Sequence, residues 1–246
     1  DRSPSRGLGD VYKRQLENNI PAHLRDPGNE WFGLSIRART LIYNTKKMDS
    51  SELSTYEDLA DPKWRKRLCL RTSKKVYNQS LVAMLIAEHG EAEAEKIVRG
   101  WVANLATDPL SDDTRALEFV AAGKCDVTLV NTYYFGRLMQ KDPSLPLAVF
   151  WPNQNNGGVH VNISGAGITR YSRNEQAAIK LLEFLSSDKA QNLFADVNME
   201  YPANPRIKVD PFVAAWGSFK QNPMNLVKAG ELQTTAVKLM DRAGYR

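Results

Sequence analysis

Two adjacent tyrosines, Tyr133 and Tyr134, carry the strongest chemical signal in the sequence. They follow the run from Asp126 to Asn131, which is typical of a buried strand, and a helix is expected to begin near Tyr133. In an open α/β sheet, ligands bind beyond the carboxyl ends of the strands. The pair therefore either faces a ligand or is structural, with Tyr133 capping the turn and Tyr134 packing in the core.

A third tyrosine, Tyr77, has a similar position. It follows a strand candidate and a loop with the small hydroxyls of Thr72 and Ser73, and it precedes a helix. Hydroxyls and N–H groups at a helix start suit an anion. Three phenols at one edge of a parallel sheet would form a hard, anionic oxygen site for Fe³⁺. A phenol with a pKa of about 10 ionises at neutral pH only beside a charge such as a trivalent cation.

Short apolar runs that alternate with amphipathic stretches must position these side chains. The expected strands cover residues 40–43, 68–70, 126–131, 147–150 and 159–163. The expected helices lie in residues 78–105 with a break at Gly90, after Ser111–Asp113, after Tyr133, behind a capping box of Ser172 and Glu175, and in 223–244 with a break at Gly230. This alternation predicts an α/β fold with mainly parallel sheets flanked by helices.

Composition and motifs exclude several classes of protein. The 33 Lys and Arg residues nearly balance 28 Asp and Glu residues and are interspersed with them, so no nucleic-acid partner is expected despite the net charge of +5. No apolar run reaches the roughly 18 residues of a transmembrane helix, and no catalytic or nucleotide-binding motif is present. Cys69 and Cys125 are expected to be two buried, inert thiols, with a disulfide between them as the alternative.

The first fifteen residues differ from the rest of the chain. They contain neither an initiating Met nor the apolar core of a signal peptide. The stretch resembles translated sequencing-adapter read-through, so residues 1–15 are expected to be a non-native segment. The alternative is a native, basic arm without fixed structure.

Several segments together resemble the ferric-iron-binding proteins of bacterial ABC importers, which are transferrin-like periplasmic binding proteins. The matching segments are residues 31–39, 77–81, 126–134, 158–167 and 200–205. Asn131-x-Tyr133-Tyr134 after a strand is the most specific of these. The 56-residue spacing from Tyr77 to Tyr133 fits the three-tyrosine subgroup of the family.

The resemblance implies the bilobal type II periplasmic-binding-protein fold, with Fe³⁺ in the cleft between two α/β lobes. It makes Tyr77, Tyr133 and Tyr134 the phenolate ligands. A synergistic anion such as carbonate or phosphate completes the metal's ligands in this family. The residues expected to contact this anion or support the site are Arg37, with Arg39 as runner-up, Thr72, Ser73 and Asn131.

The resemblance also implies interleaved lobes. Residues 40–163 and 215–246 are expected to form the tyrosine-bearing C-terminal lobe, and residues 16–39 and 164–214 an N-terminal lobe. Nothing in the sequence corresponds to the family's first segment, so we expect a fragment with one incomplete lobe. The expected partner is the inner-membrane permease of an ABC importer, and the protein is expected to be a periplasmic monomer.

Two other functions are compatible with the same residues. A related binding protein for a phosphonate, a polyamine or another small solute would use the aromatic residues to stack on its ligand. An enzyme would use Tyr77 or Tyr133 as a general acid or base. Convergence of the three tyrosine hydroxyls on one point favours the iron-binding function over both.

Overall fold

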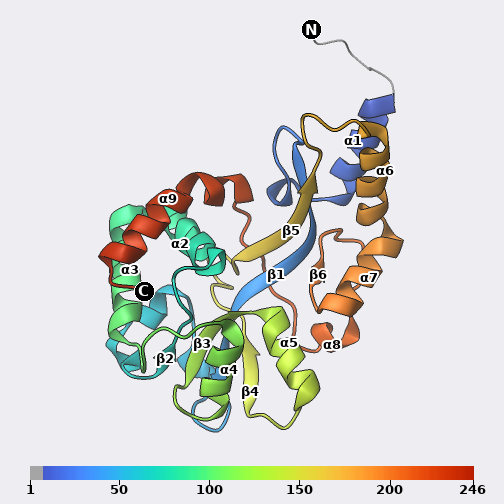
Figure 1. Cartoon of the computed structure of the whole chain (residues 1–246). Helices are drawn as coiled ribbons and strands as arrows, with labels where there is room; N and C mark the ends of the chain where they lie inside the picture. Colours follow the sequence, from blue (N-terminus) through green and yellow to red (C-terminus); the bar gives the residue numbers. More distant parts are fainter. Residues whose placement is uncertain (1–7) are drawn as a thin grey trace. The chain divides into compact units, whose positions relative to one another are not determined.

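One long strand, β1 (Trp31–Asn44), runs through both of the units into which the chain divides. The computed structural model describes residues 8–246, apart from the side chains of residues 8–13 and 194–197 (Figure 1). Unit 1 comprises Asp1–Arg37 and Ile163–Ala215, and unit 2 comprises Ala38–Asn162 and Trp216–Arg246. The assignment of these units to an incomplete N-terminal lobe and a C-terminal lobe stays a prediction.

The sheet of unit 2 has the strand order β2-β3-β1-β4. These strands are β2 (Leu68–Cys69), β3 (Val127–Asn131), the second half of β1, and β4 (Leu147–Phe150). The expectation of mainly parallel sheets is wrong for these pairings: β1 is antiparallel to β3 and to β4, and only β2 and β3 are parallel. The prediction of parallel strands was based on strands that alternate with helices. It does not apply to β1, which enters from unit 1 and has no helix before it in unit 2.

Alternating side chains of this sheet fill two separate cores. Leu41 packs in one core and its neighbour Ile42 in the other. In β3, Leu129 and Val130 divide in the same way. This period of two is the geometry of a strand whose two faces are both covered, so the central strands are buried on both sides and hold the site on a rigid base.

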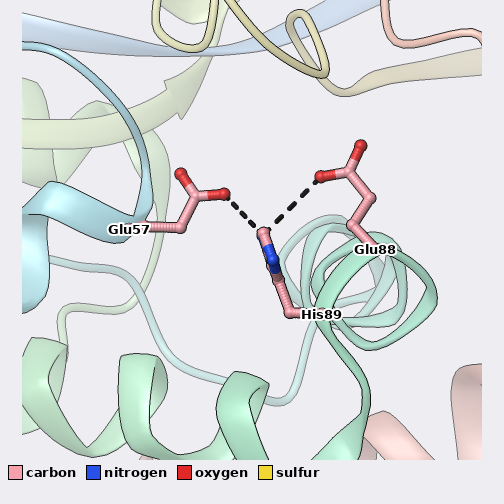
Figure 2. A group of neighbouring side chains, drawn as sticks. All are labelled: Glu57, Glu88 and His89. Carbon is pink, nitrogen blue, oxygen red and sulfur yellow. Dashed lines mark hydrogen bonds and ion pairs between the residues drawn. The ribbon is translucent and has the colours of Figure 1, made fainter.

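Three helices cover the first core. They are α2 (Val76–His89), α3 (Glu91–Ala103) and α9 (Leu226–Arg242). Gly90 separates α2 from α3 with a φ of 80°, as the sequence predicted, whereas α9 continues through Gly230 without the expected break. At the end of α2, His89 contacts Glu57 of the short 3-10 helix η3 (Glu57–Ala60) (Figure 2).

The helices of the second core are α4 (Asp113–Ala121) and α5 (Thr132–Lys141). Asp112 caps α4, since its carboxylate accepts a hydrogen bond of 2.8 Å from the backbone N–H of Arg115. Helix α5 follows β3 without an intervening loop, as predicted. The first turn of α5 therefore lies at the carboxyl end of a buried strand.

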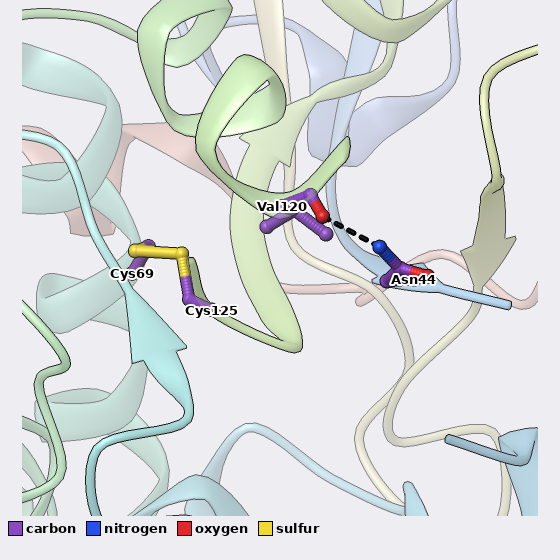
Figure 3. The surroundings of a disulfide bond; sticks show 4 residues. All are labelled: Asn44, Cys69, Val120 and Cys125. Carbon is purple, nitrogen blue, oxygen red and sulfur yellow. Dashed lines mark hydrogen bonds between the residues drawn. A yellow bond between two sulfur atoms is a disulfide. The ribbon is translucent and has the colours of Figure 1, made fainter. Parts of the chain in front are cut away.

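The expectation of two free thiols is wrong, because Cys69 and Cys125 form a disulfide (Figure 3). Cys69 is in β2, and Cys125 lies two residues before β3, which pairs with β2. Beside the disulfide, Asn44 donates a hydrogen bond of 2.7 Å to the carbonyl of Val120 near the end of α4. The 56-residue separation hides a contact that only the pairing of the two strands creates.

Removal of this disulfide is expected to destabilise the chain by about 3 kcal/mol, because the unfolded chain regains the entropy of a long loop. The Cys69→Ser/Cys125→Ser variant and the reduced wild type should show the same loss in urea denaturation followed by circular dichroism. An unchanged midpoint on reduction, with loss of the disulfide verified by mass, would contradict the prediction.

Unit 1 contains the first half of β1 with β5 (Val161–Gly167), which begins in unit 2, and β6 (Tyr201–Pro202). Its helices are α1 (Leu8–Asn19), α6 (Glu175–Ser186), α7 (Asp188–Asn198) and α8 (Pro211–Ala214). The expected capping box is wrong, because α6 has Asn174 as its N-cap, with no side-chain cap, and Ser172 lies two residues before it.

Short 3-10 helices complete the described chain. They are η1 (Ala22–Leu24), η2 (Ser50–Glu52) and η4 (Pro62–Trp64). Of the segment predicted to be non-native, residues 1–7 lie outside the described residues and the remainder forms much of α1. Within residues 8–246, no helix combines the length and the hydropathy that a membrane span requires.

Candidate metal centre

The three tyrosines predicted from the sequence come together in unit 2. The hydroxyl of Tyr133 donates a hydrogen bond of 3.4 Å to the hydroxyl of Tyr77. The rings of Tyr133 and Tyr134 lie against each other, with centroids 4.2 Å apart. Tyr77 comes from the first turn of α2 and the other two from the first turn of α5. Two helix starts thus supply three phenols to one place.

Burial and the two neighbouring phenols favour the protonated form of Tyr133. Tyr133 is 6% exposed, and Tyr77 and Tyr134 are half-buried. Burial raises the pKa of Tyr133 above its ordinary value, and its interactions with Tyr134 and Tyr77 raise it further. We therefore expect Tyr133 to become anionic only when a positive ion takes the place of its proton.

Guanidinium groups lie over two of the three rings. Arg71 lies 5.2 Å from the centroid of the Tyr77 ring, and Arg39 lies 6.0 Å from it. Arg137 of α5 is 5.1 Å from the ring of Tyr133. These cations hold the rings by contact with their π faces and surround the phenols with positive charge.

A buried ion pair lies next to the three tyrosines. Arg39 and Asp113 are fully buried, and Arg39 Nη1 donates to Asp113 Oδ2 over 2.6 Å. Arg71 Nη1 donates to the other carboxylate oxygen over 3.2 Å. One carboxylate therefore faces two guanidinium groups, which leaves a net buried charge of one positive.

The same pair fixes both helix starts that carry the tyrosines. Arg39 Nη2 donates to Asn78 Oδ1 over 2.6 Å, and Arg39 Nη1 donates to Asn131 Oδ1 over 3.1 Å. Asp113 Oδ2 accepts the backbone N–H of Asn131 over 3.0 Å. Asn78 follows Tyr77 in the chain and Asn131 precedes Tyr133 by two residues, so this network sets the positions of the phenols.

The residues predicted to contact an anion lie in three different places. Asn131 is fully buried in the network, and among the described residues its Nδ2 has no hydrogen-bond partner. Ser73 lines a hollow of about 580 Å³ beside Lys74, Lys238 and Tyr245, and no tyrosine of the trio lines this hollow.

The polar groups of Thr72 and Arg37 bind partners other than the three tyrosines. The backbone N–H of Thr72 donates to the carbonyl of Leu110, and its side chain accepts from the N–H of Lys74. Arg37 belongs to unit 1, where it donates 2.6 Å to the carbonyl of Ile163 and lies 3.5 Å from the carboxylate of Glu200. The runner-up Arg39 is fully buried and bound to Asp113.

Sequence reasoning missed Asp113, Arg71 and Asn78. The sequence predicts a helix after Ser111–Asp113 but does not show that Asp112 alone caps it while Asp113 is buried in an ion pair. Arg71 could have been recognised from its place directly after the apolar run 68–70. A charged side chain at the end of a buried strand needs an ion-pair or hydrogen-bond partner. The partner itself lies 42 residues along the chain.

His160 belongs to the core beside this site. It is 1% exposed, and its Nε2 is hydrogen-bonded to Ser80 Oγ over 3.0 Å. Burial lowers the pKa of His160 to about 3, with a further contribution from the charge of Arg39. The imidazole is therefore neutral and holds α2 to the segment before β5.

Comparisons with known proteins point in one direction. Residues 6–220 match the family of bacterial extracellular solute-binding proteins. Iron uptake protein A1 of Synechocystis sp. is 43% identical over 242 residues, which cover 96% of this chain and 67% of that protein. The major ferric iron-binding protein of Neisseria meningitidis is 26% identical over 229 residues, which cover 88% of this chain and 65% of that protein.

The fold has a similar counterpart among solved structures. A Trichodesmium protein in complex with iron and citrate ligands superposes with a TM-score of 0.92 at 44% identity. The superposition covers 94% of this chain and 75% of the Trichodesmium chain. Neighbours of this kind are type II periplasmic iron-binding proteins, so the α/β fold class predicted from the sequence is confirmed.

Proposed function

The chain belongs to the family of bacterial extracellular solute-binding proteins, and from this premise we propose that it captures Fe³⁺ as cargo for the permease of an ABC importer. The observation that carries the proposal is the convergence of Tyr77, Tyr133 and Tyr134 at two helix starts. The similar proteins are themselves named for iron uptake and ferric iron binding. The family is one of solute-binding proteins and not of enzymes, as predicted.

Charge explains why three phenols suit this cargo. Three phenolates neutralise one trivalent ion, and hard oxygen ligands suit a small, highly charged cation. The buried cluster of Arg39, Arg71 and Asp113 adds one positive charge beneath the rings, which stabilises phenolate oxygens next to it. The site therefore needs no carboxylate ligand to hold Fe³⁺.

We assign to Asn131 a contact with an anion that shares the ion with the phenolates. Its buried Nδ2 is a donor without a partner among the described residues, and the hydroxyl of Thr132 beside it has none either. Both lie at the start of α5, where the N–H groups of the first turn favour negative charge. Carbonate and phosphate both fit this chemistry, and Arg37, Thr72 and Ser73 stay predictions for the same role.

The setting of the function is part of the proposal. Family membership supports a protein outside the cytoplasmic membrane that hands its solute to an ABC transporter. We place the capture step in the periplasm and take the protein to act as a monomer. The near balance of 33 basic and 28 acidic residues supports the absence of a nucleic-acid partner.

Binding of Fe³⁺ is expected to release protons and to weaken as the pH falls. Because the pKa of Tyr133 is raised, the ion must displace a phenolic proton, and protons and Fe³⁺ compete for the same oxygen. For each proton that Fe³⁺ must displace, the apparent affinity falls by up to about tenfold when the pH is lowered by one unit. A titration with ferric citrate in weak buffer, followed by visible absorption and by pH, checks both effects.

Citrate alone, titrated into the protein, is the control for protons that come from the chelator. A visible phenolate-to-iron band that grows together with proton release supports the proposal. Uptake of iron without a band, or with equal affinity at about pH 8 and about pH 5, would assign the cargo to other ligands.

A further inference from the structure

A second group of metal-ligating side chains lies in unit 2 at the opposite end of helix α2 from Tyr77. Glu88 and His89 are the last residues of α2, and Glu57 opens η3 (Figure 2). One ligand atom from each of the three lies within 4.8 Å of the others. We propose that Glu57, Glu88 and His89 bind a divalent first-row transition-metal ion such as Zn²⁺, separately from the cargo site.

The distances suit one shared ion. His89 Nε2 lies 2.8 Å from Glu57 Oε1 and 3.9 Å from Glu88 Oε2. Ligands of a tetrahedral Zn²⁺ at about 2.0–2.2 Å are roughly 3.4 Å from one another, a value between the two observed separations. Small side-chain adjustments would thus place all three atoms around one ion.

Buried amides already orient both carboxylates. Asn153 is 1% exposed, and its Nδ2 donates to both oxygens of Glu57 over 3.2 and 3.0 Å. Asn222 is 3% exposed, and its Nδ2 donates to Glu88 Oε1 over 2.5 Å. Glu88 Oε2 is then left to face His89. Polar groups that orient ligands in this way are typical of metal sites.

The side-chain amides of Asn153 and Asn222 are fixed in turn. Asn153 Oδ1 accepts the N–H of Tyr56 over 2.9 Å, and Asn222 Oδ1 accepts the N–H of Met224 over 3.0 Å. Each amide therefore has its nitrogen directed at a carboxylate and its oxygen occupied. These amides therefore hold the carboxylates of Glu57 and Glu88 in fixed positions.

Gly157 supplies the space for Glu88. A Cβ at this position would lie 2.5 Å from Glu88 Oε1 and 3.1 Å from Asn222 Nδ2. Any side chain here would displace the carboxylate, so the backbone is shaped around it. This provides a substitution that moves a ligand without removing it.

The charge of the cluster favours a cation. In the described part of the chain, the ion-pair partner of both carboxylates is His89, and neither is paired with Lys or Arg. Both oxygens of Glu57 accept hydrogen bonds from the buried amide of Asn153, which hold the carboxylate in place. Two carboxylates and one imidazole match the ligand preference of a divalent transition-metal ion.

The competing arrangement is the hydrogen bond that already joins His89 Nε2 and Glu57 Oε1 over 2.8 Å. A bound ion would take the place of this hydrogen bond, so titration with the metal distinguishes the two arrangements. Both cysteines are in a disulfide, and no thiolate competes for the added metal.

The test is a calorimetric titration of the whole chain with Zn²⁺ at about pH 7.5, with Co²⁺ absorption as a second readout of coordination. We expect one Zn²⁺ per chain and at least about tenfold weaker binding in His89→Ala, Glu57→Gln and Glu88→Gln. Gly157→Ala is expected to weaken binding similarly while every ligand stays present. Thermal melting and circular dichroism show that each variant is folded.

Two control variants keep the result specific. His23→Ala removes an imidazole of unit 1, and Glu118→Gln removes a surface carboxylate paired with Arg115; both should leave Zn²⁺ binding unchanged. Tyr133→Phe/Tyr134→Phe should also retain it, which separates this site from the cargo site. No uptake of Zn²⁺, or equal affinity in the wild type and His89→Ala, would overturn the proposal.

Discussion

The Tyr133→Phe/Tyr134→Phe variant is expected to lose most of the phenolate-to-iron absorption band and to bind Fe³⁺ on the order of a thousandfold more weakly, a change of about 4 kcal/mol. The variant removes two of the three phenolate oxygens. Tyr77 alone then neutralises only one of the three positive charges of Fe³⁺. The rings stay, and with them the stacking of the pair at 4.2 Å and the packing of α5. Competition against citrate with absorption readout measures the loss.

Tyr171→Phe is the matched control for this experiment. Its side chain is 87% exposed in unit 1, so the same chemical change there should leave both the band and the affinity as in the wild type. Tyr77→Phe alone should show an intermediate loss, because Tyr77 is one of three oxygens. Full affinity in the double variant would show that the phenols are not the ligands.

The largest expected effect on stability comes from Asp113→Ala, which should destabilise the chain by about 4 kcal/mol. The substitution leaves Arg39 buried without its carboxylate and removes the ion-pair partner of Arg71. It also removes the acceptor of the backbone N–H of Asn131. Urea denaturation gives the free energy of unfolding, and the Fe³⁺ titration reports on the displaced tyrosines.

Asp112→Asn is the matched control at the neighbouring position. Asp112 is only partly buried and caps α4, and Asn is an equally good N-cap, so the change should be within roughly 0.5 kcal/mol. Equal stability of Asp112→Asn and Asp113→Ala would mean that the buried charge network contributes nothing to the fold.

The tyrosines were predictable because their signal is local. Tyr133 and Tyr134 follow a strand that its own apolar run reveals, and Tyr77 stands at a second such junction. Helices α2 and α3 were predictable for the same reason, since Gly90 marks the break between them. In each case the residues that decide the structure are within one turn or one strand of each other.

The features that the sequence did not reveal depend on contacts between distant segments. Asp113 lies 74 residues from Arg39, and the disulfide closes over 56 residues. The antiparallel pairing of β1 was missed because periodicity shows that a strand is buried but not which neighbour it has. The resemblance implied Arg37 as the anion partner with Arg39 as runner-up, and nothing in the sequence indicated that the unit boundary falls between them.

The buried pair of Arg39 and Asp113 also limits how this protein can diverge. Substitution of one of the two residues leaves the charge of the other buried without a partner, so neither residue can be replaced on its own without a large loss of stability. A neutral pair would have to arise in one step, and even then Arg71 and the amide of Asn131 would need new partners. The phenols carry no such linkage, because each can lose its oxygen and keep its ring. Descendants of this sequence would therefore give up their metal long before they remodel the charges beneath it.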